Sequence, residues 1–239
     1  MSRQKIMPQY QIIENDILNH IKSGKLKIGE KLMPEKELCK LYGTSRMTVN
    51  KALQLLAAKG YIKRIVGSGS FISMPTVATR ASTVRSFSND MRSKGLVPGS
   101  KLIDYKIIRG KDNVRVMEKL NLDETDMIHY FQRLRTGNDS PIAISNTFVP
   151  VSMMNALDIY SLESSFYEYV EKTLGFVPSV KNYNFEACAP TKEQLELLSI
   201  EEGCLLKVSS TALAPSSEPF DYRETFYIAS LYTYSIEFD

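Results

Sequence analysis

The 239-residue chain has few residues of the kinds that hold metals or form disulfides. Cys39, Cys188 and Cys204 are widely spaced and form no CxxC pair, and His20 and His129 are the only histidines. This set predicts neither a metal site nor a disulfide framework, and it suits a reducing cytoplasm. No apolar run approaches the roughly 18–20 residues of a membrane span, and the N-terminal residues lack the apolar core of a signal peptide. We therefore expect a cytoplasmic protein with no membrane partner.

A catalytic constellation is missing as well. No serine, histidine and acid fall in a recognisable nucleophile elbow, and the glycines at Gly67 and Gly69 are too close together for a phosphate-binding loop. The sequence therefore favours a binding protein without a cofactor over an enzyme.

Charge is divided unevenly along the chain. Residues 1–74 carry 13 Lys and Arg against 5 Asp and Glu, a net charge of +8, whereas residues 75–239 carry 17 against 22, a net charge of −5. This division indicates that the N-terminal part meets nucleic acid. Chance clustering of solvated lysines is the alternative explanation.

The stretch from Leu38 to Gly69 predicts a helix-turn-helix followed by a hairpin. A short apolar helix ends at Gly43, Thr44 and Ser45 are placed to cap a second helix, and Gly60 ends that helix. After it, YIKRIV and SFISM predict two short strands. A basic hairpin beside a helix-turn-helix is a wing, so this segment predicts a winged helix-turn-helix that binds duplex DNA. The buried stripe of the second helix is expected to be Val49, Ala52, Leu53, Leu56 and Ala57.

The residues predicted to contact DNA lie on the exposed side of the second helix and next to it. Guanidinium, amide and ammonium groups on the first exposed turns suit entry into a major groove. Arg46 is expected to contact a base or a phosphate, with neighbouring residues fixing the DNA backbone. The full set is Lys36, Ser45, Arg46, Met47, Thr48, Asn50, Lys51 and Gly67.

Residues 8–72 resemble the DNA-binding domain of the GntR family of bacterial transcriptional regulators. The chain departs from the family at two positions. Pro34 lies one place later than the family's usual proline, so the serine that caps the helix starting here is lost. In the recognition helix, Asn50 replaces a frequent second arginine. Asparagine pairs naturally with adenine, so the operator is expected to differ from the family's commonest one. The matching segments are PQYQII, SGKLKIGEKL, PEKEL, GTSRMTVNKALQLLAAKGYI and GSGSFI.

Residues 73–84, SMPTVATRASTV, have no apolar periodicity and predict a linker. The expected organisation is therefore a DNA-binding domain over residues 1–72, a linker over 73–84, and a second domain over 85–239.

The second domain contains an internal repeat. An offset of 78 residues places residues 117–150 over residues 195–228 without a gap, so that Leu120 meets Leu198. Each copy predicts a helix, an acidic turn, a strand, a hairpin turn and a strand. The segments KLIDYKII, SVKNYNFEAC and YTYSIEF could add three strands to these four. The expected fold class is α+β, with one antiparallel sheet, helices packed on it and internal pseudo-symmetry.

Several features of residues 82–238 are together similar to the UTRA effector domain. These are a Ser-Phe-Ser helix start, an Arg-x-Arg strand, an x-Pro hairpin, the segment SSFYEYV and the ending YTYSIEF. The UTRA domain defines the HutC branch of the GntR regulators and shares its fold with chorismate lyase. The resemblance implies a chorismate-lyase-like sheet domain with flanking helices that binds an effector and dimerises.

Arg133 and Arg135 lie two apart on a predicted strand and therefore project from one face. Adjacent guanidiniums repel each other unless an anion lies between them or each pairs with a carboxylate of a neighbouring strand. The resemblance matches this pair to the strand that binds the effector, and it matches Ser165 and Tyr167 to positions that help hold it. We expect these four residues to converge on one anionic group, preferably a phosphate.

Other positions are matched to the rest of the effector pocket. Phe87 and Ser88 correspond to its lip, although a capped helix with a core phenylalanine explains them equally well. Ser145 stands where an acid is frequent in members that bind amino-sugar phosphates. Tyr232 and Glu224 are expected to face the polar body of the ligand, and the alternative for Glu224 is a salt bridge with Arg223 or another neighbour.

The sequence thus predicts a bacterial, cytoplasmic, sequence-specific transcriptional repressor. Its expected partners are double-stranded operator DNA, a second copy of the chain, and a small anionic metabolite such as a sugar phosphate or amino-sugar phosphate. Two alternatives stay open. One is an enzyme that uses the lyase-like fold, and the other is a DNA-binding protein that responds to no effector.

Overall fold

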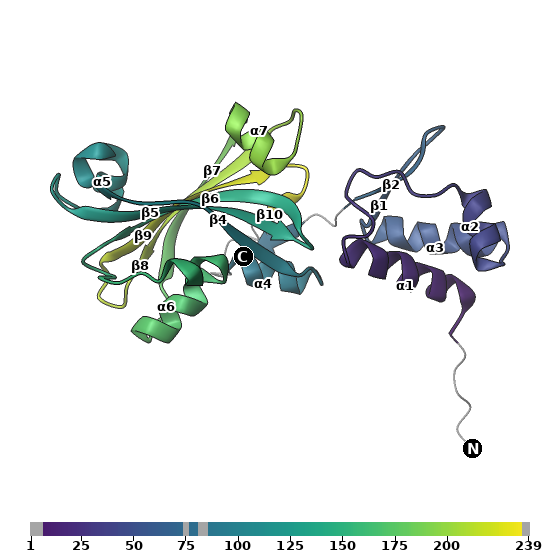
Figure 1. Ribbon diagram of the computed structural model, residues 1–239, viewed down its shortest axis with the longest axis horizontal. Coiled ribbons are helices and arrows are strands. Elements are labelled where there is room, and N and C mark those ends of the chain that lie inside the picture. Colours follow the sequence, from purple (N-terminus) through teal and green to yellow (C-terminus); the bar gives the residue numbers. More distant parts are fainter. Residues whose placement is uncertain (1–6, 74–76, 81–85, 236–239) are drawn as a thin grey trace, which may run out of the picture. The chain divides into compact units, whose positions relative to one another are not determined.

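The computed structural model describes residues 7–73, 77–80 and 86–235 of the chain (Figure 1). Its internal contacts divide the chain into two compact units that meet between Thr76 and Val77. This junction falls inside the segment that the sequence predicts as a linker. Each unit has a hydrophobic core of its own, as expected of separately packed domains. No helix in the described segments combines the length and the apolar character needed to cross a membrane.

In its described residues, the first unit has three helices followed by a β-hairpin. The two strands pair antiparallel, with Ile62 opposite Ile72. Gly43 lies in the turn before the third helix at φ 60°, a conformation that residues with a Cβ rarely adopt. The predicted winged helix-turn-helix is confirmed. Its elements are α1 (Gln9–Lys22), α2 (Glu35–Tyr42), α3 (Arg46–Ala58), β1 (Ile62–Ile65) and β2 (Gly69–Ile72).

The core of this unit lies between α1 and α3. Ile13 and Ile17 of α1 belong to the same buried cluster as the apolar stripe of α3. Each fully buried aliphatic side chain contributes on the order of 1.5–3 kcal/mol, so the packing of this stripe fixes which side of α3 stays exposed. The stripe is buried at Val49, Ala52, Leu53 and Leu56, and Ala57 packs at its margin.

Helices α2 and α3 begin differently. Ser45 caps α3, because its hydroxyl oxygen accepts a hydrogen bond from the Thr48 amide at 3.3 Å. Pro34 stands at the N-cap of α2 and makes no side-chain cap bond, which agrees with the loss of the capping serine. Glu35 is therefore the first residue of α2, where the helix dipole favours a carboxylate.

The second unit is built on a six-stranded antiparallel sheet within residues 86–235. The order across the sheet is β4-β5-β6-β9-β8-β7, so β6 and β9 lie at its centre and β4 and β7 at its edges. The bounds are β4 (Pro98–Arg109), β5 (Met127–Gly137), β6 (Ser140–Pro150), β7 (Ser179–Cys188), β8 (Leu205–Leu213) and β9 (Pro219–Ile228).

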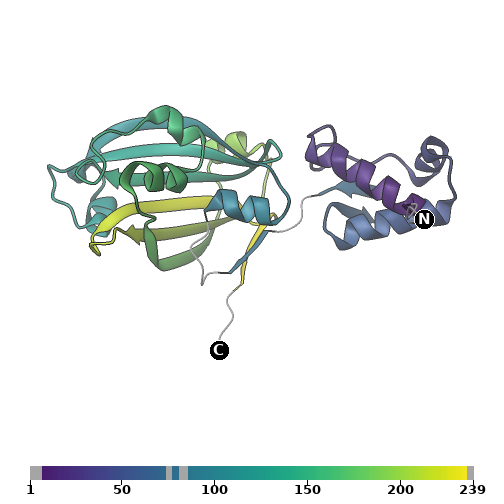
Figure 2. The same ribbon diagram turned by 90° about the horizontal axis from the view of Figure 1, so that it is seen from below.

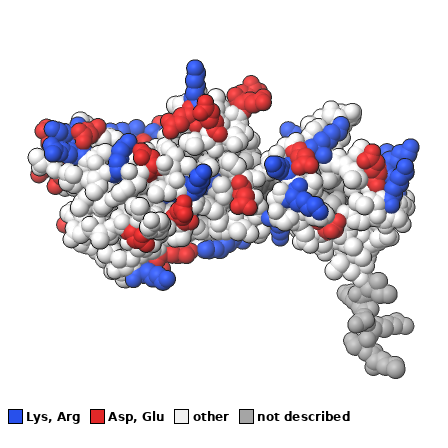
Figure 3. All heavy atoms as spheres, viewed as in Figure 1, with Lys and Arg blue, Asp and Glu red and all other residues white. Residues whose placement is uncertain are grey.

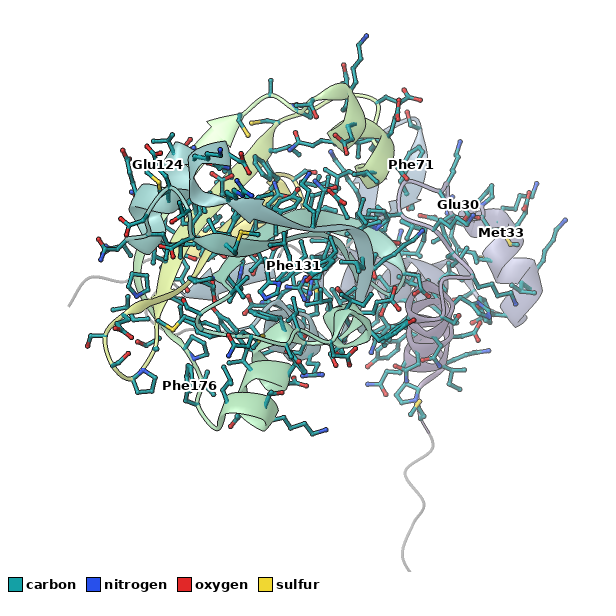
Figure 4. All side chains as sticks on the ribbon, turned by 60° about the vertical axis from the view of Figure 1, so that its left-hand side comes forward. Glu30, Met33, Phe71, Glu124, Phe131 and Phe176 are labelled. Atoms are coloured by element: carbon teal, nitrogen blue, oxygen red, sulfur yellow. The ribbon has the colours of Figure 1, made fainter. Side chains whose placement is uncertain are left out.

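Helices lie on both faces of this sheet. The helices α4 and α6 cover one face, and α5 and α7 lie on the other (Figures 1 and 2). Phe131 of β5 points into the layer covered by α6, where it contacts Phe166 at a ring-centroid distance of 5.1 Å (Figure 4). The helical segments are α4 (Phe87–Ser93), η1 (Gly110–Asp112), α5 (Val114–Leu120), η2 (Ile159–Glu163), α6 (Phe166–Leu174) and α7 (Lys192–Leu198).

The internal repeat is visible in the fold. Helices α5 and α7 start and end at positions 78 residues apart in the sequence. Their C-caps, Asn121 and Ser199, both adopt positive φ, at 53° and 54°. At the centre of the sheet Asn146 pairs with Glu224, its own equivalent in the repeat. A pseudo-two-fold axis therefore passes between β6 and β9 at this pair.

The ending YTYSIEF was predicted to join the main sheet, and this prediction is wrong. Its described part, β10 (Tyr232–Ser235), pairs in parallel with β3 (Val77–Arg80) in a separate two-stranded sheet. Strand β3 lies within residues 73–84, the segment that the sequence predicts as a linker. The sequence did not reveal this pairing because two short strands so far apart in the chain leave no local pattern. The edges of the main sheet are formed by the longer strands β4 and β7 instead.

The repeat allows a paired test of core packing. Leu120→Ala and Leu198→Ala should each lower the free energy of unfolding by about 2–5 kcal/mol, because both side chains are 2% exposed in equivalent positions. Urea unfolding of the full chain measures the change. Lys119→Ala, one residue away and exposed, is the control and should have little effect. Two leucine variants as stable as this control would contradict the packing described.

Candidate functional site

The exposed side of α3 carries residues predicted to read DNA. Arg46 and Met47 are largely exposed at the start of the helix, and Asn50 lies one turn later on the side of Arg46. Ser45 and Thr48 hydrogen-bond to each other through their hydroxyls at 2.9 Å. These two side chains therefore stabilise the start of the helix that presents Arg46.

A groove runs between α2, α3 and the hairpin. Lys36 of α2, Arg46 of α3 and Gly67 of the hairpin turn line it together. Lys51 is directed elsewhere, because its ammonium lies 4.0 Å from the centre of the Tyr10 ring of α1. Of the residues predicted to contact DNA, Lys36, Arg46 and Gly67 line this groove, whereas Lys51 lies beside α1.

Two further residues, Glu35 and Arg64, also line this groove, and sequence reasoning did not single them out. Glu35 accepts hydrogen bonds from Arg46 at 3.2 Å and from Arg64 of β1 at 2.7 Å. Arg64 also donates to Asn50 at 3.1 Å. The basic character of the hairpin was a signal for Arg64, but its partners come from other elements and are visible only in the fold.

The second candidate site is a buried pocket beneath the sheet, on the face covered by α4 and α6. Arg133 and Arg135 of β5 project into it side by side and are 3% and 4% exposed. The enclosed space is about 60 Å³, enough for several waters or one small anion. We call it the arginine pocket. Its lining includes Phe87, Arg133, Arg135, Ser145, Ser165, Tyr167, Ser210, Arg223, Thr225, Tyr227 and Tyr234.

Most of the predicted effector residues are in this lining. Ser88 lies directly behind it and accepts a hydrogen bond from Arg135 at 3.5 Å. Tyr232 also stands behind the lining, because its hydroxyl donates to Asp90 and its ring stacks on Tyr227. Phe87, Arg133, Arg135, Ser145, Ser165 and Tyr167 are the predicted residues that line the pocket itself.

The assignment of Glu224 to this pocket is corrected by the structure. Successive side chains of a strand point to opposite faces, and the neighbours Arg223 and Thr225 point into the pocket. Glu224 therefore lies on the other face, where it forms ion pairs with Lys207 at 3.0 Å and Arg115 at 3.3 Å. The salt-bridge alternative holds, with these partners in place of Arg223.

Arg223 is a charged residue of the pocket that sequence reasoning did not place there, as it also did not place Ser210, Thr225, Tyr227 and Tyr234. Its guanidinium forms an ion pair with the fully buried Asp221 at 3.3 Å and stacks over the Tyr167 ring at 4.5 Å. Burial disfavours the charged form of Arg223, but Tyr167 and Asp221 raise its pKa above the usual value. The pKa of Asp221 is raised by burial, and its ion pair with Arg223 opposes that rise.

The arginines of β5 lack such a partner among the described residues of the pocket. Burial lowers the pKa of Arg133 well below its usual value, and the positive charges of Arg135 and Arg223 lower it further. Burial and Arg223 lower the pKa of Arg135 to about 10. With a pKa of about 10, Arg135 stays charged at neutral pH. Because arginine guanidiniums are not deprotonated in proteins, the pocket carries more positive than negative charge.

Several hydrogen-bond donors of the pocket are unused. Among the described residues, the Nε atoms of Arg133, Arg135 and Arg223 are buried without a hydrogen-bond partner, and so is the hydroxyl of Ser165. Ser165 is the N-cap of α6 but forms no cap bond, so its hydroxyl is available to a ligand. Buried donors without partners are costly. A bound anion would satisfy them and the surplus charge together.

The rest of the lining is mainly aromatic and hydroxyl-bearing. The Arg135 guanidinium lies 4.5 Å from the Phe87 ring at the start of α4. Tyr227 and Tyr234 also line the pocket, with their ring centroids 6.2 Å apart, and Ser145 hydrogen-bonds to Thr225 at 3.2 Å. Such a lining suits a polar ligand body with hydroxyl groups. In the described residues, no group of three or more His, Cys, Asp or Glu is arranged to hold a metal ion.

On the side of the second unit shown in Figure 3, Lys and Arg groups are interspersed with Asp and Glu groups. Surface charges of mixed sign give no strong single-sign patch. The arginine pocket, in contrast, gathers three buried guanidiniums, one of which forms an ion pair with Asp221.

Comparison with known proteins matches both parts of the chain to known families. A model of the bacterial regulatory proteins of the gntR family matches residues 9–72, and a model of the UTRA domain matches residues 93–233. The chain is 30% identical to the HTH-type transcriptional repressor NagR of Bacillus subtilis, over 98% of this chain and 96% of that protein. It is 25% identical to the mannosyl-D-glycerate transport/metabolism system repressor MngR of Escherichia coli, over 96% and 95%.

Among solved structures, PhnF from Mycobacterium smegmatis has a TM-score of 0.67 and 17% identity, covering 94% of this chain and 98% of that one. YydK from Bacillus subtilis has a TM-score of 0.58 and 22% identity, covering 98% and 100%. At these identities the likeness concerns the fold alone.

The electrostatic imbalance predicts that Arg135→Met stabilises the ligand-free protein. Removing a buried charge that lacks a carboxylate partner should raise the free energy of unfolding by about 1–4 kcal/mol, measured by urea unfolding in a buffer without phosphate or sulfate. Because the pKa of Arg135 is lowered to about 10, this gain should be constant at lower pH and shrink as the pH rises above that value.

The matched control for this measurement is Arg92→Met. Arg92 is exposed and pairs with Glu168, so its loss should change the free energy of unfolding by less than about 0.5 kcal/mol. An Arg135→Met variant that is less stable than the wild type would mean that Arg135 is a structural residue rather than a ligand group.

Proposed function

Because the chain belongs to the GntR family of bacterial regulatory proteins, with a UTRA domain that places it in the HutC branch, we propose that it is a DNA-binding transcriptional repressor controlled by a small anionic effector. The relatives NagR and MngR are named as repressors, which supports repression over activation. The groove beside α3 is the DNA-binding surface in this proposal, and the arginine pocket is the effector site.

One observation carries the effector proposal. The guanidiniums of Arg133, Arg135 and Arg223 line one pocket where Asp221 neutralises one of them, and their Nε atoms lack hydrogen-bond partners among the described residues. A phosphate group fits this arrangement better than a carboxylate. Its tetrahedral oxygens can accept from several guanidinium forks and from the start of α6 at once.

We infer that the effector is a sugar phosphate or an amino-sugar phosphate. Its hydroxyl groups would meet the hydroxyls of Ser210 and Thr225 and the rings of Phe87, Tyr227 and Tyr234. A sugar ring needs more room than the present 60 Å³. The pocket must therefore open when such a ligand binds, and its wall must move.

That opening supplies a route to the DNA-binding unit. Tyr234, a wall residue, belongs to β10, and β10 pairs with β3, which begins at the junction of the two units. An effector that shifts β10 would alter the segment from which the DNA-binding unit departs. Such a ligand changes DNA binding only by its difference in affinity for the two arrangements.

The DNA-bound form is proposed to be a homodimer on a palindromic site. One recognition helix reads too few base pairs to select a site in a genome, and a two-fold pair of helices doubles that information. We propose that residues 85–239 carry the main dimer interface and that residues 73–84 connect it to the DNA-binding domain over residues 1–72. Light scattering of the free protein and of its DNA complex tests this.

Two other functions are separated by simple measurements. An enzyme that used the lyase-like fold would consume its ligand, whereas a sensor returns the ligand unchanged after incubation. A DNA-binding protein without an effector would show no thermal shift in a screen of sugar phosphates, amino-sugar phosphates and small carboxylates.

The assignment of α3 predicts that Arg46→Ala weakens binding to a selected operator by about 1–3 kcal/mol, because a base or phosphate contact is lost. Fluorescence anisotropy at several salt concentrations measures the change. Arg92→Ala, an exposed arginine of the second unit, is the control. An Arg46→Ala variant with wild-type affinity and an unchanged salt dependence would show that another surface binds DNA.

The assignment of the arginine pocket predicts that Arg133→Ala abolishes the response to any effector found by the thermal-shift screen, while operator affinity stays unchanged. The lost guanidinium removes one arm of the anion site. Arg115→Ala, on the opposite face of the sheet, should respond like the wild type. An Arg133→Ala variant that responds at the same effector concentration would place the effector elsewhere.

A further inference from the structure

Three elements of the first unit meet at one carboxylate. Arg46 of α3 donates through Nε to Glu35 Oε2 at 3.2 Å, and Arg64 of β1 donates through Nη2 to Glu35 Oε1 at 2.7 Å. Arg64 uses its other terminal nitrogen, Nη1, to donate to Asn50 Oδ1 at 3.1 Å. A continuous chain of hydrogen bonds therefore runs from the first residue of α3 through α2 and the hairpin, and returns to α3 one turn later.

Exposure separates the two ion pairs of this chain. The side chains of Glu35 and Arg64 are 21% and 36% exposed, whereas that of Arg46 is 83% exposed. An exposed pair contributes little and is readily exchanged, so Arg46 is free to leave Glu35 for DNA. The more shielded pair between Glu35 and Arg64 is the one that holds its geometry.

The bond from Arg64 fixes which way the Asn50 amide points. A guanidinium only donates hydrogen bonds, so the atom of Asn50 that faces Arg64 is Oδ1, and Nδ2 faces away. An amide oxygen has two acceptor sites, so Oδ1 can still accept a second bond. Adenine is read by an asparagine whose oxygen accepts from N6 while its nitrogen donates to N7. Arg64 therefore selects one amide orientation and leaves both reading atoms usable.

We propose that Arg64, held in place by Glu35, is a positioning residue that orients Asn50 to read an adenine of the operator. The proposal rests on the proposed DNA-binding function of this surface. It assigns to the hairpin a part in base recognition that differs from a phosphate contact. Glu35 is suited to its part because it is the first residue of α2, where the helix dipole stabilises its charge and no capping side chain competes for the amides.

A selection experiment on the full-length protein tests this proposal. The probe is a library of 30-base-pair duplexes with a randomised centre, from which the wild type and each variant enrich their preferred sites. Variants are Asn50→Ala, Arg64→Ala, Arg64→Lys and Glu35→Gln. The control is Lys63→Ala, which removes a neighbouring charge of β1 that has no hydrogen bond to this chain of residues among the described contacts. Thermal melts confirm that each variant is folded.

The wild type should enrich a site with an adenine in each half, and Asn50→Ala should lose the preference at that position. Arg64→Ala should lower the same preference by about 5-fold or more, the lower end of what a bidentate base contact contributes. Arg64→Lys should fail to restore it, because an ammonium has no fork to bridge Glu35 and Asn50. Glu35→Gln, which keeps the shape, should lower it in the same direction. Adding Arg64→Ala to Asn50→Ala should cause no further loss of preference.

Two results would overturn the inference while leaving the proposed function standing. One is an Arg64→Ala variant whose affinity falls equally for all bases with a salt slope reduced by about one, as expected of a phosphate contact. The other is an adenine preference that survives Asn50→Ala. A wild type that enriches no duplex would overturn the proposed DNA-binding function, and this inference with it. Lys63→Ala should weaken all duplexes alike.

Discussion

The main physical constraint on the second unit is that the guanidiniums of Arg133, Arg135 and Arg223 are held away from water inside it. Taking a charge into a protein interior costs several kcal/mol unless a partner compensates it. Among the described residues, Asp221 forms its ion pair with Arg223. The surrounding apolar layer, with Phe131, Phe166 and Phe220 in one cluster, supplies the stability that offsets this cost. Each guanidinium also lies against an aromatic ring, which softens the penalty without removing it. The fold therefore maintains a buried surplus of positive charge that the proposed anionic effector would compensate.

The internal repeat explains the architecture of the second unit but not the arginine pocket. The reason is that the strand pairing in the β5–β6 hairpin differs by one residue from that in the equivalent β8–β9 hairpin. Arg133 pairs with Ser145, and the repeat would place Thr211 opposite Arg223. Thr211 instead pairs with Tyr222, on the face that carries Glu224. The β5–β6 hairpin shifts register after Arg135, and the β8–β9 hairpin shifts after Ala212. A single site thus arises in a duplicated fold, since a shift by one residue turns a strand's side chains to the opposite face.

The features that depend on local sequence patterns could be predicted from the sequence alone, whereas those that depend on contacts between distant segments could not. Helix spacing, glycine turns and the repeat predicted the winged helix-turn-helix, the strands of the main sheet and the shared face of Arg133 and Arg135, because each depends on local periodicity. Side-chain alternation along a strand places Arg223 and Glu224 on opposite faces of the sheet, but no local signal tells which face is the pocket. The pairing of β10 with β3 and the contact of Arg64 with Asn50 join distant segments. Only the assembled fold reveals such contacts.

Arginine side chains lie in the proposed binding sites of both units, and their exposure to solvent determines how strongly each can interact with an anion. On the proposed DNA-binding surface, Arg46 already has a carboxylate partner in water, so it could exchange Glu35 for a DNA phosphate at little cost. Its contribution is screened by salt and belongs to the counterion-dependent part of DNA affinity. In the arginine pocket, Arg133 and Arg135 have no carboxylate partner among the residues that the structure describes, and the low dielectric around them strengthens any contact with an anion. Effector binding should therefore tolerate salt concentrations that dissociate the DNA complex, since the same charged group is screened in one unit and enclosed in the other.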